Sequence, residues 1–224
     1  MSPFGEPTAL DRYLVRLTGS DHPQVCFAPT ASGDDAGYIH KFLTAYGALG
    51  VRTSVLTLWS GAAEAVDRLA EADLMFVGGG STVNLVALWQ AHGVSDVVRQ
   101  RYQEGSLVLA GISAGAACWY QGCVTDSFGD LRPWTGGLGL VRGSFCPHLD
   151  GEPERDPIYT AAVASGELPG GYAADDGAGV HYVDGVPAHF LCERPGQNVY
   201  RVLPNDIPGP AVIREPQEMT VLPA

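Results

Sequence analysis

The sequence predicts an α/β fold in which a mostly parallel sheet carries helices on both faces and ends in an antiparallel edge near the C-terminus. Two observations predict it. Short apolar segments alternate with helical segments through the first half of the chain, and from about Tyr172 strand-like segments follow one another closely. The chain has 224 residues, 46% of them hydrophobic. That is enough for one ordinary core, and we expect a single domain over residues 1–224.

The strand-like segments of the first half are short and apolar or β-branched, and the helical segments are longer and often bounded by glycine. In chain order, helices are expected over 8–17, 35–46, 62–71, 82–90, 95–104 and 114–120, and strands over 24–28, 51–56, 73–77 and 106–110. Helices of this length between strands act as right-handed crossovers, which join parallel strands.

In the C-terminal part, strand-like segments follow one another without helical segments between them. Val180–Val183, the turn Asp184-Gly185 and Pro187–Cys192 indicate a β-hairpin, and Tyr200–Leu203 and Met219–Leu222 indicate later strands. We therefore expect an antiparallel edge on the α/β core.

Charge and cysteine content limit the partners and the cellular compartment expected for this protein. A net charge of −12 and a pI near 4.7 disfavour nucleic acid and anionic membranes as partners, because both would be repelled. The N-terminus shows no basic region followed by an apolar run, and no apolar stretch is long enough to span a membrane. These features predict a cytoplasmic protein. The five cysteines form no CxxC pair, which argues against disulfides and zinc; they are Cys26, Cys118, Cys123, Cys146 and Cys192.

A sharp turn follows the strand predicted over 106–110. Its sequence, Gly-Ile-Ser-Ala-Gly, runs from Gly111 to Gly115 and places Ser113 between a strand and a helix. In such an elbow the glycines allow a strained backbone that exposes the serine oxygen above the sheet, and the helix N-terminus favours negative charge. A helix-capping serine in a tight turn is the competing interpretation. The preceding apolar strand favours a nucleophile.

Two further motifs carry polar groups that suit acyl transfer. Gly78-Gly79-Gly80 ends another strand, and its unhindered N–H groups suit an oxyanion hole or a phosphate. The spacing is not Gly-x-Gly-x-x-Gly, which weakens a dinucleotide interpretation. His148 follows the apolar segment 143–146 and Pro147, and it is the best candidate for a general base among the six histidines.

Taken together and in order, these motifs resemble the peptidase E family, the aspartyl dipeptidases of peptidase family S51, which are related to cyanophycinase. The resemblance runs from about Val25 to Val183 and rests on Gly78–Gly80, Gly111–Ala116, Thr125–Ser127 and Cys146–His148. It implies a flavodoxin-like fold similar to class I glutamine amidotransferases. It also implies hydrolysis of dipeptides with an N-terminal aspartate, and a homodimer.

Carried over to this sequence, the resemblance implies a triad of Ser113 as nucleophile, His148 as general base and Asp126 as its acidic partner, with Asp130 as a competitor for that role. Backbone N–H groups near Gly79 or Gly80, and at Ala114, would hold the oxyanion. This chemistry needs no metal or cofactor, and the sequence contains no HExxH or CxxC spacing.

Arg155 matches the family arginine that recognises the substrate aspartate. A guanidinium can pair bidentately with a β-carboxylate. The same segment holds Glu152, Glu154 and Asp156, any of which can neutralise the arginine instead. The sequence around Trp119–Cys123 differs from the family's aspartyl dipeptidases, so strict aspartate preference is open.

Other classes of protein stay open at this point. A glutamine amidotransferase needs cysteine where this chain has Ser113. A serine esterase would also explain the elbow, although α/β-hydrolases usually have a longer chain and a later histidine. A small-anion-binding module would use Gly78–Gly80 as a cradle and leave Ser113 inert, and it would not react with a fluorophosphonate.

Overall fold

A computed structural model describes residues 5–59, 61–205, 207, 209 and 211–223. The chain divides into two compact units, one reaching to Gly115 and the other running from Ala116 to Pro223, and each is described by itself. Whether residues 1–224 form the expected single domain stays a prediction.

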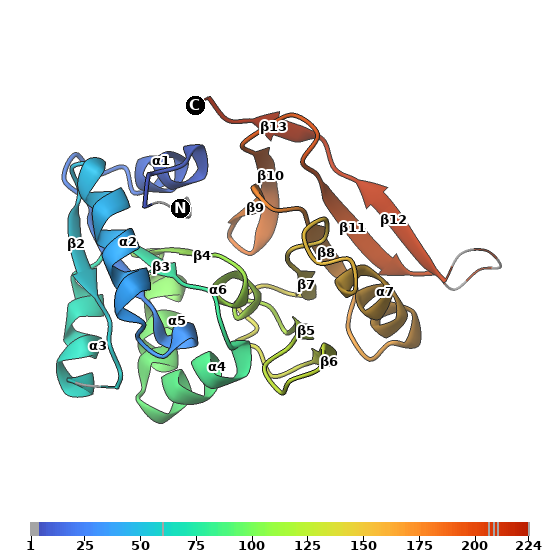
Figure 1. The fold of residues 1–224 in the computed structure, drawn as a ribbon, viewed down its shortest axis with the longest axis horizontal. Coiled ribbons are helices and arrows are strands. Elements are labelled where there is room, and N and C mark those ends of the chain that lie inside the picture. The colour runs from blue at the N-terminus through green and yellow to red at the C-terminus, as the bar shows by residue number, and fades with distance from the viewer. Residues whose placement is uncertain (1–4, 60, 206, 208, 210, 224) are drawn as a thin grey trace. The chain divides into compact units, whose positions relative to one another are not determined.

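The first unit is a four-stranded parallel sheet with helices (Figure 1). Its strand order is β2-β1-β3-β4, and every neighbouring pair is parallel. The elements are α1 (Ala9–Leu17), β1 (Gln24–Ala28), α2 (Ala36–Ala48), β2 (Arg52–Val55), α3 (Ala62–Ala70), β3 (Leu74–Val77), α4 (Thr82–Ala91), α5 (Val94–Glu104) and β4 (Val108–Gly111). Each begins and ends within two residues of its predicted range.

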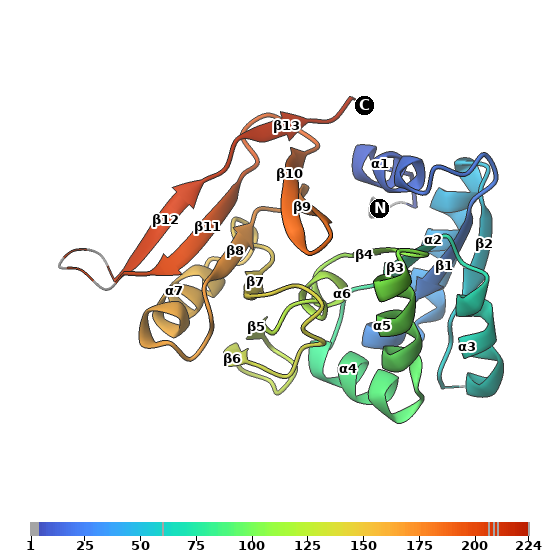
Figure 2. The same ribbon diagram turned by 180° about the vertical axis from the view of Figure 1, so that it is seen from behind.

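Helices cover both faces of this sheet. Figure 1 shows α2 in front of the strands, and Figure 2, seen from behind, shows α5 on the opposite face. On the α2 face, Phe27 of β1 stacks on Phe42 of α2 with ring centroids 4.5 Å apart. Both side chains are fully buried, together with Tyr46 and Leu74. Burial of these large apolar side chains fixes α2 against the ends of β1 and β3.

The second unit contains a mixed six-stranded sheet of order β12-β11-β8-β7-β5-β6 and a three-stranded sheet of order β13-β10-β9. The pairs β5–β7 and β7–β8 are parallel, and β8–β11, β11–β12, β5–β6 and β9–β10 are antiparallel. The elements are β5 (Gly122–Thr125), β6 (Arg132–Trp134), β7 (Ser144–Cys146), α7 (Arg155–Ser165), β8 (Gly171–Ala174), β9 (Ala178–Val183), β10 (Val186–Cys192), β11 (Val199–Pro204), β12 (Val212–Pro216) and β13 (Met219–Val221).

The predicted fold class is confirmed, including the hairpin β9–β10, and β11–β12 is antiparallel as expected of the C-terminal edge. The strand expected near the C-terminus, β13, differs from that expectation because it pairs with β10 in parallel. The helix expected over 114–120 is wrong in length, because α6 comprises only Ala114–Ala117. The carbonyls of Cys118, Trp119 and Tyr120 accept hydrogen bonds from the loop at 138–141 instead of continuing a helix. No helix among the described residues is long and apolar enough to cross a membrane.

Candidate active site

Ser113 lies in a strained turn directly after β4. Its φ is 56°, a left-handed conformation that a residue with a side chain rarely adopts. The turn is tied to the neighbouring strand, since the N–H of Ile112 donates to the carbonyl of Val77 at 3.1 Å. A Cβ atom at Gly115 would lie 2.2 Å from that same carbonyl oxygen, so only glycine fits there. The local geometry is the one expected of a nucleophile elbow.

Of the three glycines after β3, Gly79 lies beside this serine. A Cβ atom on Gly79 would be 3.1 Å from Ser113 Cβ and 3.6 Å from Ser113 Oγ. Gly80 has a φ of 137°, and a Cβ there would be 2.2 Å from the carbonyl oxygen of Ala31. Because β3 and β4 are parallel neighbours, their carboxyl ends bring both turns to one edge of the sheet.

Among the described residues, neither the backbone N–H of Gly80 nor that of Ala114 at this edge donates a hydrogen bond. The N–H of Gly79 donates to the Tyr38 hydroxyl at 3.2 Å. Of the oxyanion donors predicted from the sequence, Gly80 and Ala114 therefore have the unpaired groups that a developing negative charge needs.

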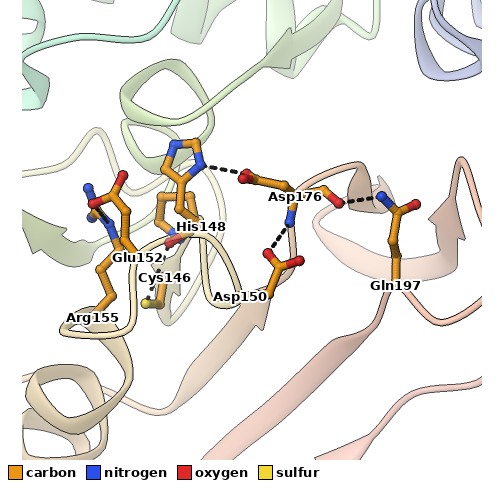
Figure 3. Close-up of polar contacts among 8 residues, drawn as sticks. Cys146, His148, Asp150, Glu152, Arg155, Asp176 and Gln197 are labelled. Carbon is orange, nitrogen blue, oxygen red and sulfur yellow. Dashed lines mark hydrogen bonds and ion pairs between the residues drawn. The ribbon is translucent and has the colours of Figure 1, made fainter.

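His148 of the second unit also has a strained backbone. Its φ is 58°, and it lies two residues after β7. Its Nδ1 is 2.6 Å from Oδ1 of Asp176, which lies in the turn between β8 and β9 (Figure 3). The histidine side chain is 22% exposed, and the aspartate side chain is 58% exposed. An ionised Asp176 accepts the Nδ1 proton, and this tautomer leaves Nε2 able to take a proton from a nucleophile.

The Asp176 turn is held from two sides, as Figure 3 shows. The N–H of Asp176 donates to Asp150 Oδ1 at 2.8 Å, and its carbonyl accepts from Gln197 Nε2 at 2.6 Å. Gln197 is anchored in turn, since its Oε1 accepts the N–H of Arg194 at 2.8 Å. These contacts hold the backbone of the turn that carries the carboxylate bonded to the imidazole.

Asp126, the acidic partner inferred from the sequence, lies exposed just after β5. Its carbonyl accepts the N–H of Gly129 at 2.8 Å. Among the described residues no hydrogen bond joins the carboxylate of Asp126, or that of Asp130, to His148. The pairing expected at Asp126 is found at Asp176, which lies 28 residues after His148 and has no local motif to mark it.

Arg155 is the first residue of α7 and is 5% exposed. Its Nε donates to Glu152 Oε2 at 2.7 Å and its Nη1 to the Val124 carbonyl at 3.1 Å. Of the acidic neighbours considered from the sequence, Glu152 thus neutralises it, whereas Asp156 pairs with Arg214 at 2.8 Å. Recognition of substrate by Arg155 stays a prediction.

We expect Arg155→Ala to lower the free energy of unfolding by about 1–3 kcal/mol, because the Val124 carbonyl loses its donor. Glu152 is 43% exposed, so water can solvate its freed carboxylate. Urea denaturation measures the loss. A role in recognition additionally requires a selective fall in turnover of Asp-X relative to Ala-X by the folded variant, and a uniform fall would contradict it.

The cysteine that precedes His148 by two residues offers no alternative nucleophile. Cys146 is fully buried, and burial raises the pKa of its thiol to about 12. All five cysteines are buried, and none of them forms a disulfide in the described part of the chain.

A parallel α/β sheet with a serine elbow is typical of hydrolytic enzymes, and so is a histidine paired with a carboxylate. The chain belongs to peptidase family S51, whose family model matches residues 2–187.

Relatives agree with this assignment. The chain is 41% identical over 196 residues to the uncharacterized peptidase YgaJ of Bacillus subtilis (strain 168), covering 87% of this chain and 84% of that one. Among solved structures, a peptidase from an acI-B1 Actinobacterium superposes with a TM-score of 0.68 at 16% identity, covering 95% of this chain and 87% of that one. A candidate peptidase E protein from Listeria monocytogenes EGD-e gives 0.56 at 19% identity, with 97% and 96% covered. At these identities the two structures support the fold.

Proposed function

We propose that this peptidase is a serine dipeptidase that hydrolyses Asp-X dipeptides through an acyl-enzyme. The observation that carries the proposal is Ser113, held at a φ of 56° directly after β4 and next to Gly79. A strained serine at the carboxyl end of a parallel strand, beside unpaired backbone N–H groups, is an arrangement that α/β hydrolases use for acyl transfer. The family match and the resemblance to peptidase E support the dipeptide substrate.

In the proposed mechanism Nε2 of His148 takes the Ser113 hydroxyl proton as the serine oxygen bonds to the scissile carbonyl carbon. The resulting oxyanion accepts hydrogen bonds from the N–H groups of Gly80 and Ala114. The C–N bond then breaks, and the imidazolium gives its proton to the leaving amine. Water attacks the acyl-enzyme with His148 again as base, and Ser113 regains its proton when the acid is released.

Asp176 takes the place of Asp126 as the acidic member of the proposed triad. Its carboxylate accepts the Nδ1 proton of His148 at 2.6 Å, which fixes the tautomer and stabilises the imidazolium. The cytoplasmic setting and the homodimer stay predictions.

A panel of Asp-X, Glu-X, Ser-X and Ala-X dipeptides, with free and blocked N-termini, tests the proposed substrate. We expect turnover of Asp-X with a free N-terminus to exceed that of the other dipeptides. Equal rates on acidic and neutral dipeptides would overturn the aspartyl preference. Rapid ester hydrolysis without dipeptide turnover would favour the esterase.

Reagents directed at thiols, metals or the serine provide a second test. We expect iodoacetamide at neutral pH to leave turnover unchanged, because burial raises the pKa of Cys146 to about 12 and that of Cys26 to about 11. Dialysis against a chelator should also leave turnover unchanged, because the proposed steps use only protein groups and water. A fluorophosphonate should abolish activity and modify Ser113. Activity lost on chelation and restored by zinc would contradict the mechanism.

A further inference from the structure

Tyr38 of α2 takes no part in the steps proposed above, yet its hydroxyl is hydrogen-bonded beside the serine elbow. It accepts the N–H of Gly79 at 3.2 Å, and Gly79 is the glycine that faces Ser113. The two residues are 41 positions apart in the sequence, and both belong to the first unit. The contact places a side-chain hydroxyl one peptide unit from the Gly80 N–H.

The Tyr38 side chain is held by several neighbours. The backbone N–H of Tyr38 donates at 2.7 Å to Oδ1 of Asp35, the N-cap of α2, which fixes the start of the helix that carries the ring. Its ring meets the Phe27 ring edge-on, with centroids 5.1 Å apart. A Cβ on Gly78 would lie 2.9 Å from Tyr38 Cε1, so the glycine makes room for the ring. The helix cap and the aromatic core thus determine where the hydroxyl lies.

The backbone around the Gly80 N–H is fixed on both sides. Tyr38 holds the N–H of Gly79, which belongs to the preceding peptide unit. In the following unit, the N–H of Ser81 donates to the Ala31 carbonyl at 2.8 Å. The unit between them carries the Gly80 N–H, and two glycines alone would leave it free to rotate. An oxyanion hole is effective when its donors already point at the charge before it develops.

We propose that Tyr38 is a positioning residue of the oxyanion hole, whose hydroxyl holds the Gly79 N–H so that the Gly80 N–H points at the tetrahedral intermediate. The inference rests on the proposed function and deepens it. Burial raises the pKa of Tyr38, which keeps the hydroxyl neutral and puts no competing negative charge beside the oxyanion.

Tyr38→Phe tests the inference, because it removes one oxygen and keeps the ring. We expect kcat for Asp-X to fall by about 10- to 100-fold, less than the loss of a whole oxyanion donor, with KM nearly unchanged. Affinity for an aspartyl boronic acid, which forms a tetrahedral adduct with serine, should fall by a similar factor. Affinity for free aspartate, a ground-state ligand, should not change.

Tyr46→Phe is the matched control. Tyr46 lies on the same helix, is fully buried, and donates its hydroxyl to Asp11 Oδ1 at 3.0 Å. Among the described residues no hydrogen bond joins it to Gly79, whose N–H donates to Tyr38. Loss of the Tyr46 hydroxyl should lower the melting temperature and leave kcat and the affinity for the boronic acid as in the wild type.

The outcomes separate this inference from the proposed function. Unchanged or faster turnover by Tyr38→Phe, with unchanged boronic acid affinity, would overturn the role of Tyr38 if Ser113→Ala still abolishes activity. Equal kinetic losses in the Tyr38 and Tyr46 variants would also overturn it, because they would indicate general loosening of α2. A wild-type protein that neither cleaves dipeptides nor reacts with a fluorophosphonate would refute the proposed function itself.

Discussion

Ser113→Ala is expected to lower kcat for the best dipeptide by roughly four to six orders of magnitude, as loss of a catalytic serine does in other serine peptidases. The physical reason is that alanine has no oxygen to form the acyl-enzyme. The backbone N–H groups of Gly80 and Ala114 remain, so a small rate above that of uncatalysed hydrolysis should persist. Initial rates at high enzyme concentration measure the residual activity.

The fold should tolerate this substitution. Ser113 makes no side-chain hydrogen bond among the described residues, and alanine keeps the Cβ that lies beside Gly79. Ser106→Ala is a suitable control, because Ser106 lies in the same unit and its side chain, within the described ranges, bonds to Arg101 and Glu104 at the end of α5. It should keep full activity and fluorophosphonate labelling. Normal turnover by Ser113→Ala would show that the nucleophile is another group.

Asp176→Asn is expected to reduce kcat by about 10²- to 10⁴-fold, the upper figure being that of the corresponding change in a serine protease. The asparagine amide donates to Nδ1 of His148, which moves the imidazole proton to Nε2. That nitrogen can then no longer accept a proton from Ser113. Steady-state rates as a function of pH measure the effect, and NMR of the histidine nitrogens reports the tautomer.

Asp126→Asn is the matched control for this prediction. Asp126 is an exposed aspartate of the same unit, and its carbonyl rather than its carboxylate makes the turn to Gly129. We expect its kcat to stay near the wild-type value. The opposite result, a large loss at Asp126 and none at Asp176, would restore the acidic partner inferred from the sequence and contradict the contact at His148.

The two acidic residues show why the sequence located only part of the site. Ser113 was predictable because strand, glycines and serine are contiguous, and backbone sterics alone force the turn. His148 stood out because an apolar strand and a proline precede it. Asp176 lies 28 residues beyond His148, after β8, and its proximity depends on the parallel pairing of β7 with β8. No local pattern encodes that pairing.

The sequence by itself determined the parallel α/β architecture, the C-terminal hairpin, the strained serine and the glycine turn beside it. These follow from residue periodicity, helix caps and turn chemistry, which act over a few neighbours. The tertiary structure alone decided that His148 pairs with Asp176, that Glu152 neutralises Arg155 and that α6 ends at Ala117. It also decided that the Tyr38 hydroxyl accepts the N–H of Gly79. These contacts depend on which competing partner the packed chain brings within hydrogen-bonding distance, and several partners of equal chemistry lie close together in the sequence.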